Sequence, residues 1–441
     1  MEKKVFIKTF GCQMNEYDSE KINDVLTKKN NLIQTTEQKN ADLIILNTCS
    51  IREKAEVKVY SDLGRIRKLK ESNPNLRIAV GGCVASQEGA NIIEKAPYVD
   101  VVFGPQTLHR LPNLLKKREE NGNPQIDISF PEIEKFDHLP SPNTENPSGI
   151  VSIMEGCSKY CSFCVVPFTR GEEVSRPMDD ILKEIINLTL KGATEITLLG
   201  QNVNAYRGKM SNGKIVDFPT LIEYIAEISE IKRIRFSTSH PNEMSDALID
   251  CFKNIDKLAK MLHLPIQSGS DRVLSAMKRN YTTLEYKSII RKLRKQCPDI
   301  SITSDFIIGF PTETLEDFNS TKTLMEELKF DYSYSFIYSP RPGTPASYLK
   351  DITTYKEKLK RLHNLQATNI YQGEIFTKKM LSSIQRVLIE APSKRKSGIL
   401  LGKTDNNRIV EIEGEQSLLN QFVKVKIDKV LDKNLHGIII N

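Results

Sequence analysis

The stretch GCSKYCSFC, residues 156–164, places three cysteines on one short segment: Cys157, Cys161 and Cys164. At the cysteine frequency of this chain, chance produces that spacing roughly 0.003 times per chain. A structural zinc ion would take a fourth Cys or His, and the nearest histidine in sequence is His138. Three thiolates can instead hold three irons of a 4Fe-4S cube and leave the fourth iron open to a substrate or cofactor. The spacing therefore favours a cluster with an open position over zinc.

This cysteine segment follows the first of six strand-like runs that alternate with helical patterns from residue 149 onward. Six β/α units are too few to close an eight-fold barrel, so residues 149–374 are predicted to form an open or partial (β/α)6 barrel. Its site should lie at the carboxyl ends of the strands, where the cysteine segment also lies. The six runs are GIVSIM (149–154), EITLLG (195–200), RIRFST (233–238), KMLHLP (260–265), SITSDFIIG (301–309) and YSYSFIY (332–338).

Residues 1–118 also alternate β-rich runs with helical stretches, which is typical of a parallel sheet covered by helices. Cys12 follows the first run, Cys49 the second and Cys83 the third. Ligands of open α/β sheets bind at the carboxyl ends of the strands. We therefore expect these three cysteines to converge on one edge of an amino-terminal α/β domain.

The remaining two segments differ from both alternating regions. Residues 375–441 contain short β-type runs separated by glycines, which predicts a small all-β, OB-like barrel, a fold common among nucleic-acid binders. Twelve Lys and Arg against seven Asp and Glu give this tail +5 of the chain's net +7. Residues 119–148 lose the periodicity, and we expect an extended linker there, marked by Pro124, Pro131, Pro140, Pro142 and Pro147.

Composition limits the classes of protein that remain. With 441 residues, 39% of them hydrophobic and 27% charged, the chain has ample core for several domains and no sign of wholesale disorder. No segment reaches the ~18 apolar residues of a membrane span, and the start MEKKVFIKTFGCQM lacks a signal-peptide core. We therefore expect a cytoplasmic protein with no membrane partner. Its eight cysteines are then candidates for metal binding or catalysis rather than disulfides.

The segment GCSKYCSFC resembles the signature of the radical S-adenosylmethionine superfamily. The resemblance implies that the open iron binds the amino and carboxylate groups of S-adenosylmethionine, which one electron from an external donor then cleaves to a 5′-deoxyadenosyl radical. It also implies that Phe163 lies by the adenine, with simple packing as the alternative. Gly200, Gln201 and Asn202 occupy the place where this superfamily binds the cofactor's amino group, although an ordinary loop explains them equally well.

Within that superfamily, nearly the whole chain resembles the methylthiotransferase family. The resemblance implies that Cys12, Cys49 and Cys83 bind a second 4Fe-4S cluster and that the tail is a TRAM domain, an RNA-binding barrel. The implied cofactors are two 4Fe-4S clusters and S-adenosylmethionine, which serves as methyl donor and radical source. The stretches that carry the resemblance are TFGCQMNEYDSE (9–20), LNTCSIREKAEVKV (46–59), GGCVASQEG (81–89), EGCSKYCSFCVVPFTRGEEVSRP (155–177), LLGQNVNAYRG (198–208), HLPIQSGSD (263–271) and FIYSPRPGTPA (336–346).

The branch of the family that this chain resembles acts on tRNA. The resemblance implies methylthiolation at C2 of N6-(dimethylallyl)adenosine at position 37, in the anticodon stem-loop, and GCQMN, GCVASQEG and RPGTPA favour this branch. An aromatic C–H bond has no acidic proton and no leaving group, so a radical is needed. The alternatives are threonylcarbamoyladenosine or an aspartate of a ribosomal protein as substrate, and a non-enzymatic iron–sulfur RNA-binding regulator. We expect a monomer.

Two single residues carry weaker predictions. Asp305, at the end of a barrel strand, is predicted to face cofactor or substrate, with helix capping as the alternative. Thr312 stands where the family pattern GFPGET has glycine, because this chain reads GFPTET at residues 309–314. We expect that change to alter loop geometry rather than activity.

Other charged and sulfur-containing residues have both a functional and a structural explanation. RNA contact is favoured slightly over a surface ion-pair network for the charged residues after the cysteine segment, which are Arg170, Glu172, Glu173 and Arg176. Cys251 and Cys297 lie on helical patterns, and we expect both to be buried small hydrophobes rather than metal ligands.

Overall fold

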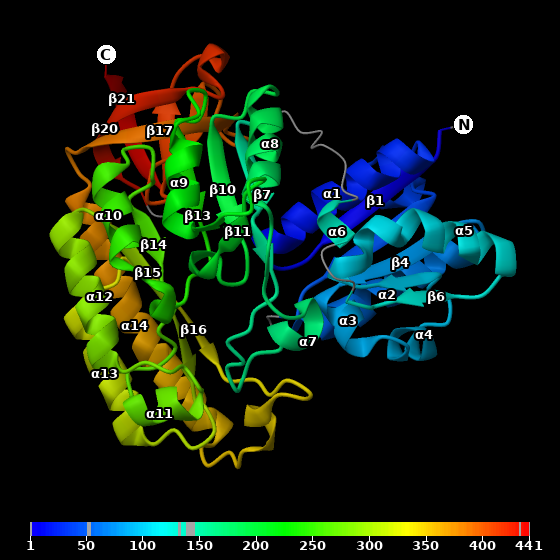
Figure 1. Cartoon of the computed structure of the whole chain (residues 1–441), viewed down its shortest axis with the longest axis horizontal. Helices are drawn as coiled ribbons and strands as arrows, with labels where there is room; N and C mark the ends of the chain where they lie inside the picture. The colour runs from blue at the N-terminus through cyan, green and yellow to red at the C-terminus, as the bar shows by residue number, and fades with distance from the viewer. Residues whose placement is uncertain (1, 51–53, 131–133, 138–145, 432–433, 441) are drawn as a thin grey trace.

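The computed structural model describes residues 2–50, 54–130, 134–137, 146–431 and 434–440, which form three parts (Figure 1). A sheet domain at the amino-terminal side, drawn blue to cyan, lies beside a central barrel drawn mainly green to yellow, and a small tail barrel is drawn orange to red. Within the described residues, no helix is long and apolar enough to cross a membrane. The predictions for Pro131, Pro140, Pro142 and for the tail charges Asp432 and Lys433 concern residues outside these ranges.

The amino-terminal sheet domain contains six parallel strands in the order β2-β1-β3-β4-β5-β6, as the alternating pattern predicts. Buried parallel strands need apolar side chains on both faces. Alternate residues of β3 accordingly pack against α2, α3 and α4 on one face and against α1 and α5 on the other. The strands are β1 (Lys4–Thr9), β2 (Ile33–Gln34), β3 (Leu43–Thr48), β4 (Arg77–Gly82), β5 (Val101–Phe103) and β6 (Gln125–Asp127); the helices are α1 (Gln13–Asn30), α2 (Lys54–Ser72), α3 (Cys83–Glu88), α4 (Asn91–Lys95) and α5 (Leu111–Asn121).

The segment 119–148, expected to be an extended linker, contains regular structure. Helix α5 continues to Asn121, and β6 pairs in parallel with β5 at the edge of the sheet. Pro124 precedes this edge strand, where a missing N–H costs no ladder hydrogen bond. Helix α6 (Glu134–Asp137) then carries Lys135 into a buried position. The prolines weaken the local strand pattern in the sequence, but they do not prevent pairing at an edge.

Six parallel strands form the central barrel in the order β7-β10-β13-β14-β15-β16, which confirms the predicted partial (β/α)6 barrel. Its two three-stranded sheets meet through a parallel bridge between Ile234 and Leu258. Among the described residues β7 and β16 are not paired with each other, so the barrel stays open along that side. The elements are β7 (Ser148–Ser152), β8 (Met154–Glu155), α7 (Val166–Arg170), β9 (Val174–Ser175), α8 (Met178–Thr189), β10 (Glu195–Leu199), β11 (Arg207–Lys209), β12 (Ile215–Asp217), α9 (Phe218–Ala226), β13 (Arg233–Phe236), α10 (Asp246–Asn254), β14 (Met261–His263), α11 (Asp271–Ala276), α12 (Thr283–Gln296), β15 (Ser301–Ile308), α13 (Leu315–Leu328) and β16 (Tyr332–Ile337).

The tail forms a closed five-stranded barrel in the order β17-β18-β19-β21-β20, as the short glycine-separated runs predict. Helix α14 (Tyr355–Lys379) runs through the expected boundary at residue 375. It contains Gly373 but no proline, and basic residues in its last turn suit the helix dipole. Met380, directly after the helix, packs into the core of the tail barrel. The strands are β17 (Ile384–Pro392), β18 (Ile399–Lys403), β19 (Ile409–Glu413), β20 (Phe422–Val430) and β21 (Leu435–Ile440).

Two arginines of β13 dock the tail barrel onto the central barrel. Arg235 donates hydrogen bonds to the backbone oxygens of Thr404 and Asp405, each at 2.6 Å. Arg233 pairs with the Asp405 carboxylate at 3.0 Å, and both arginines pair with Glu195. Burial alone would raise the pKa of Glu195, but Arg235 and Arg233 lower it to about 2. Buried charges, and not only apolar packing, therefore hold the tail barrel in place.

Candidate metal centres and active site

Cys157, Cys161 and Cys164, here called the loop set, lie on the connection from β8 to α7 at the rim of the central barrel. Gly156 precedes them with φ +74°, and a Cβ there would lie 1.9 Å from the backbone oxygen of Glu172. Only glycine therefore fits this turn. The backbone N–H of Cys157 donates to Gly171 (3.2 Å), and that of Cys164 donates to Cys161 (3.0 Å). The loop is thus fixed by its own backbone.

The loop set has the chemistry of a cluster site. Burial, followed by the nearby Cys161 sulfur, raises the pKa of Cys164 to about 12, and burial also raises the pKa of Cys157. Arg279 is buried and its Nη1 donates to Cys161 Sγ at 3.3 Å. Thiolates at these positions need a cation beside them, and a coordinated metal deprotonates a thiol. The three sulfurs and the arginine donor therefore fit an anionic iron–sulfur cluster. The sequence offered no signal for Arg279.

A second set of residues faces the loop from the end of β10. The backbone N–H of Gly156 donates to Gln201 Oε1 at 2.6 Å, so Gln201 ties this rim to the loop set. Gly200 packs so closely on Met154 that a Cβ would lie 2.4 Å from that side chain. Asn202 is buried, and its Oδ1 has no hydrogen-bond partner among the described residues. A buried acceptor of this kind fits a donor such as the ammonium group of S-adenosylmethionine.

The resemblance implies that Phe163 lies by the adenine of the cofactor, and the sequence predicts that Asp305 faces cofactor or substrate. Phe163 packs against an apolar group that includes Phe310 and Tyr338, so its environment is compatible with either packing or a cofactor ring. Asp305 lies inside β15 rather than at its end, because pairing with β16 continues to Ile308. Helix capping is therefore excluded for Asp305. Its Oδ2 lies 3.5 Å from Nε2 of His263, a residue that the sequence did not single out.

Cys12, Cys49 and Cys83, here called the auxiliary set, follow the adjacent strands β1, β3 and β4. The Cys49 thiol forms a hydrogen bond that lowers the pKa of Cys12 to about 6, although burial opposes the shift. Burial raises the pKa of Cys83, and the charge of Cys12 adds to the effect. Cys12 therefore interacts with both Cys49 and Cys83, at the edge of the sheet where the carboxyl ends of β1, β3 and β4 lie side by side.

Glycines open the backbone at two of these three positions. Gly11 precedes Cys12 with φ +100°, and a Cβ there would lie 2.3 Å from Cβ and from Sγ of Cys49. Gly82 precedes Cys83 with φ +90°, and a Cβ there would lie 2.3 Å from the backbone oxygen of Thr48. Three strand ends can approach this closely only because glycine has no side chain.

The charged residues after the loop set do not form a single RNA-facing group. Arg170 and Arg176 are 4% and 6% exposed, so the RNA contact favoured for them is wrong. Arg176 donates to Ser152 O (2.6 Å) and Glu184 (2.7 Å). Glu172 is exposed and accepts a hydrogen bond from the Tyr160 hydroxyl. Glu173 is partly buried. The sequence pattern could not show the burial, because the partners of both arginines lie elsewhere in the chain.

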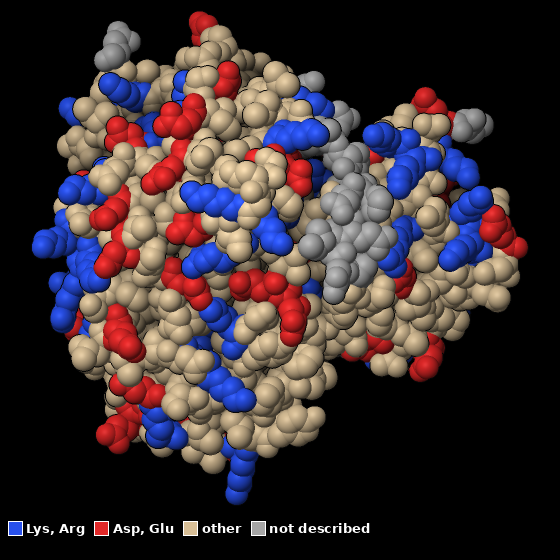
Figure 2. All heavy atoms as spheres, viewed as in Figure 1, with Lys and Arg blue, Asp and Glu red and all other residues tan. Residues whose placement is uncertain are grey.

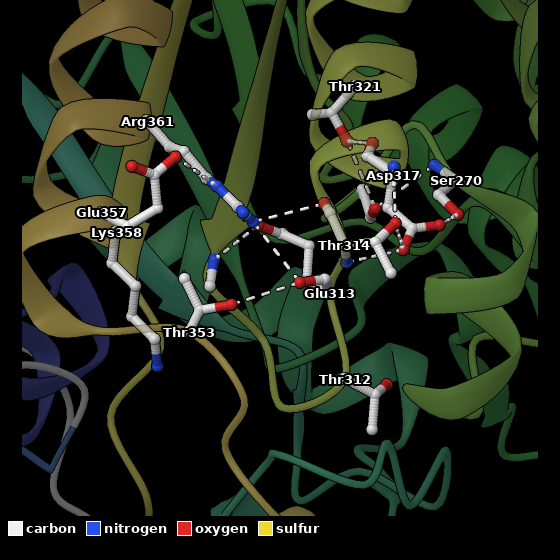
Figure 3. Close-up of polar contacts among 12 residues, drawn as sticks. Ser270, Thr312, Glu313, Thr314, Asp317, Thr321, Thr353, Glu357, Lys358 and Arg361 are labelled. Atoms are coloured by element: carbon white, nitrogen blue, oxygen red, sulfur yellow. Dashed lines mark hydrogen bonds and ion pairs between the residues drawn. The ribbon is translucent and has the colours of Figure 1, made fainter.

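The GFPTET loop follows the carboxyl end of β15 and forms a polar network with residues of α13 and α14 (Figure 3). Glu313 is buried and accepts hydrogen bonds from the backbone N–H of Gly309 (3.0 Å) and from Arg361 of α14 (2.8 Å). Thr314 caps α13 through a reciprocal capping box with Asp317. Thr312 has φ +77°, a region that a β-branched residue rarely adopts. The glycine-to-threonine difference therefore strains this loop while leaving the network around Glu313 intact.

Two further observations limit the metal chemistry. Cys251 and Cys297 are buried in the apolar core of the central barrel, as predicted. In the part of the chain that the structure describes, no three His, Cys, Asp or Glu side chains are arranged to hold a single metal ion. The fit of the two cysteine sets to clusters rests on their residue type and on their placement after the strands.

A partial (β/α)6 barrel with three cysteines on its first loop defines a radical S-adenosylmethionine enzyme, a class that uses S-adenosylmethionine and [4Fe-4S] clusters. Residues 151–325 match the Radical SAM superfamily, residues 4–104 the Uncharacterized protein family UPF0004 and residues 378–440 the TRAM domain.

Relatives identify the family. The tRNA-2-methylthio-N(6)-dimethylallyladenosine synthase of Methylobacillus flagellatus is 60% identical over 437 residues, which cover 99% of each chain. The synthase of the same name from Chromobacterium violaceum is 58% identical over 435 residues, 99% of this chain and 98% of the relative. The chain therefore belongs to the family of tRNA-2-methylthio-N(6)-dimethylallyladenosine synthases, which are radical S-adenosylmethionine enzymes.

Solved structures share the fold at low sequence identity. The radical S-adenosylmethionine methyltransferase TsrM from Kitasatospora setae, with cobalamin and a [4Fe-4S] cluster bound, superposes with a TM-score of 0.59 at 15% identity, covering 79% of this chain and 77% of TsrM. The cobalamin-dependent enzyme OxsB gives a TM-score of 0.52 at 15% identity, covering 83% of this chain and 56% of OxsB. These likenesses concern the fold alone.

Proposed function

We propose that this chain transfers a methylthio group to C2 of N6-(dimethylallyl)adenosine at position 37 of tRNA. The observation that carries the proposal is the packing of α3, which begins at Cys83, against α7, which follows the loop set. This packing brings the carboxyl ends of two parallel-stranded domains together, each with its own cysteine set. Such an arrangement suits a reaction that needs a radical and a sulfur donor in one place.

Each cofactor has a set of residues that would hold it. The loop set would bind the cluster that takes up S-adenosylmethionine, and the auxiliary set would bind the second cluster. When bound, these groups supply one-electron chemistry and the sulfur and methyl group for transfer. The chain's own residues orient them: Gln201 fixes the loop backbone, and Asn202 offers a buried oxygen to the cofactor's ammonium group. Gly200, Phe163 and Asp305 complete the proposed cofactor site.

The open edge of the central barrel supplies a surface for the nucleobase. Tyr332, Tyr334 and Phe336 alternate along β16 and are each about half exposed, whereas Ser333 between them bonds to α14. The ring of His263, which pairs with Asp305, lies 6.3 Å from the ring of Tyr334. Splayed bases of RNA are bound by stacking on aromatic side chains and by polar contacts to their edges. These residues would therefore hold an adenosine removed from its stack.

The tail barrel would bind the tRNA backbone, although not with all its basic residues. Arg386 pairs with Asp405, and Arg408 pairs with Asp331 of the central barrel. Lys424 and Lys426 are exposed on β20, and neither is in an ion pair among the described residues. On the face drawn in Figure 2, basic and acidic side chains are interspersed. A few lysines, rather than a continuous basic surface, would therefore contact phosphates.

Domain boundaries, location and partners complete the proposal. We assign residues 1–118, 149–374 and 375–441 to the three domains. The segment between the first two domains supplies part of the edge of the amino-terminal sheet. The enzyme would work as a cytoplasmic monomer with an external one-electron donor and without a membrane partner.

Mass spectrometry of tRNA nucleosides from cells that lack the protein tests the proposal. We expect 2-methylthio-N6-(dimethylallyl)adenosine to disappear and its unmethylthiolated precursor to accumulate. Loss of a methylthiolated threonylcarbamoyladenosine instead would assign the chain to the related substrate. Unchanged tRNA nucleosides, together with no S-adenosylmethionine cleavage by the reconstituted protein, would favour an RNA-binding regulator.

A further inference from the structure

Arg170 belongs to the central barrel but inserts its guanidinium group into the amino-terminal sheet domain. It ends α7, a single short helix after Cys164. Its Nη2 donates to Asp18 Oδ2 at 2.7 Å and to Asn15 Oδ1 at 3.1 Å, both on α1. Its backbone oxygen accepts a hydrogen bond from Gln106 at 2.7 Å. Contacts with the sheet domain therefore fix both the guanidinium group and the backbone of Arg170.

The same guanidinium lies beside the auxiliary set. Its Nη2 shares the Asn15 Oδ1 acceptor with the Cys12 thiol, whose Sγ lies 3.9 Å from that oxygen. Burial raises the pKa of Cys83, and the positive charge of Arg170 opposes that shift. Nη1 is buried without a hydrogen-bond acceptor among the described residues, and the carboxylate of Glu155 lies 3.6 Å from it. Burial opposes the charge of Arg170, but Asp18 first and then Cys83 raise its pKa, and Cys12 contributes as well. A buried cation whose Nη1 has no hydrogen-bond acceptor among the described residues therefore lies beside Cys12 and Cys83.

The charges around Arg170 balance only when it is present. Lys135 of α6 pairs with Asp18 at 2.8 Å and also with Glu155. All four side chains are buried. The two carboxylates and the two basic groups together carry no net charge. An anionic cluster bound beside Cys83 would therefore have Arg170 as its nearest cation. Removing a single partner from a buried charge group leaves an uncompensated charge.

We propose that Arg170 is a positioning residue of the auxiliary site, which donates a hydrogen bond to the cysteine sulfurs of the cluster there and fixes that cluster relative to the loop set. The inference rests on the proposed binding of a cluster by Cys12, Cys49 and Cys83. A planar guanidinium presents donors in two directions, so one side chain serves both Asp18 and the sulfurs. Hydrogen bonds to cluster sulfurs tune the reduction potential, and such outer partners also orient the ligands.

The rival explanation is that Arg170 only joins two domains. Arg176 supplies the matched control, because it is equally buried and bonds to Glu184, which also pairs with Lys21 of the sheet domain. Its bonded partners are Glu184 and the Ser152 backbone, and no cysteine is among them. Replacing arginine with lysine at either position keeps the positive charge but removes the planar guanidinium group, which donates hydrogen bonds in two directions. A purely structural role predicts the same outcome for both substitutions.

The experiment compares R170K and R176K in full-length protein that also carries C157A, C161A and C164A, so that only the auxiliary cluster remains. Electron paramagnetic resonance during redox titration reads the spectrum and potential of that cluster, and thermal unfolding reads stability. We expect R170K to shift both the spectrum and the potential, and R176K to leave them as in the parent while lowering the unfolding midpoint. With the loop set intact, R170K should lower methylthiolation roughly tenfold while S-adenosylmethionine cleavage continues.

Two outcomes would overturn the proposal: a parental spectrum and potential in R170K, or equal shifts in R170K and R176K. If R170K does not fold, R170Q in the same background takes its place, with the same expected shifts. A separate measurement tests the ligand assignment itself, because a C12A variant that keeps both clusters would refute the auxiliary site and not merely the role of Arg170.

Discussion

Cys157, Cys161 and Cys164 lie on one loop, whereas Cys12, Cys49 and Cys83 follow three separate strands of a six-stranded sheet. The loop set depends on local backbone bonds and on one glycine turn. The auxiliary set depends on strand order, on two glycines and on a charged partner from the neighbouring domain. A local site can be altered without disturbing the fold around it, but a distributed site is sensitive to changes far from its ligands.

Loss of the loop set should have the largest effect. Reconstituted C157A/C161A/C164A protein should hold about four irons instead of about eight and should lose S-adenosylmethionine cleavage, because the open iron is on that cluster. Iron analysis and chromatography of 5′-deoxyadenosine measure the two effects. The matched control is C251A, which alters a buried core thiol and should keep about eight irons. A triple variant that still cleaves the cofactor contradicts the assignment.

Loss of one auxiliary cysteine should separate methylthiolation from cleavage of S-adenosylmethionine. C83A should abolish methylthiolation but retain production of 5′-deoxyadenosine, because the loop set is complete without the sheet domain's sulfurs. Nucleoside analysis of the tRNA and assay of 5′-deoxyadenosine on the same sample give the ratio of methylthiolated nucleoside to 5′-deoxyadenosine. Methylthiolation at the wild-type rate in C83A would make the auxiliary set structural.

A glycine substitution tests the sensitivity of the distributed site to crowding. Both Gly11 and Gly122 have positive φ, +100° and +73°, so alanine brings backbone strain of about 1–3 kcal/mol at either position. Only at Gly11 does the new Cβ meet Cys49, since at Gly122 the nearest atom is 4.0 Å away. G11A should therefore lose auxiliary iron while G122A keeps it. Equal iron content in the two variants would show that crowding does not matter.

The smallest effect is expected at Thr312, which belongs to neither cysteine set. T312G should relieve the strained φ of +77°, and after the entropic cost of glycine we expect a gain of about 1 kcal/mol in the free energy of unfolding. Urea denaturation of the variant and wild type measures the difference. Iron content and cofactor cleavage should not change. A destabilised T312G would mean that the hydrogen bond from Arg272 to the Thr312 hydroxyl outweighs the strain.

The sequence predicts the strands and which strand each cysteine segment follows, because both depend on local patterns. Alternation of apolar runs with helical periods fixes the two parallel-stranded domains, and three cysteines directly after three strands indicate a common edge. The roles of Arg170 and Lys135 could not be predicted in this way. Each is charged, and each lies in a segment that reads as solvent-exposed, yet partners from two domains bury it.

Helix α14 has a mechanical consequence. Its 25 residues form a continuous rod about 37 Å long that starts beside the central barrel and ends at the tail barrel's core. Arg408 of the tail barrel pairs with Asp331 of the central barrel and donates to Thr377 in the last turn of the helix. The helix and this ion pair therefore hold the tail barrel against the central barrel. If the tRNA contacts both barrels as proposed, the distance between its backbone contact and its flipped base must match the fixed distance between the two barrels.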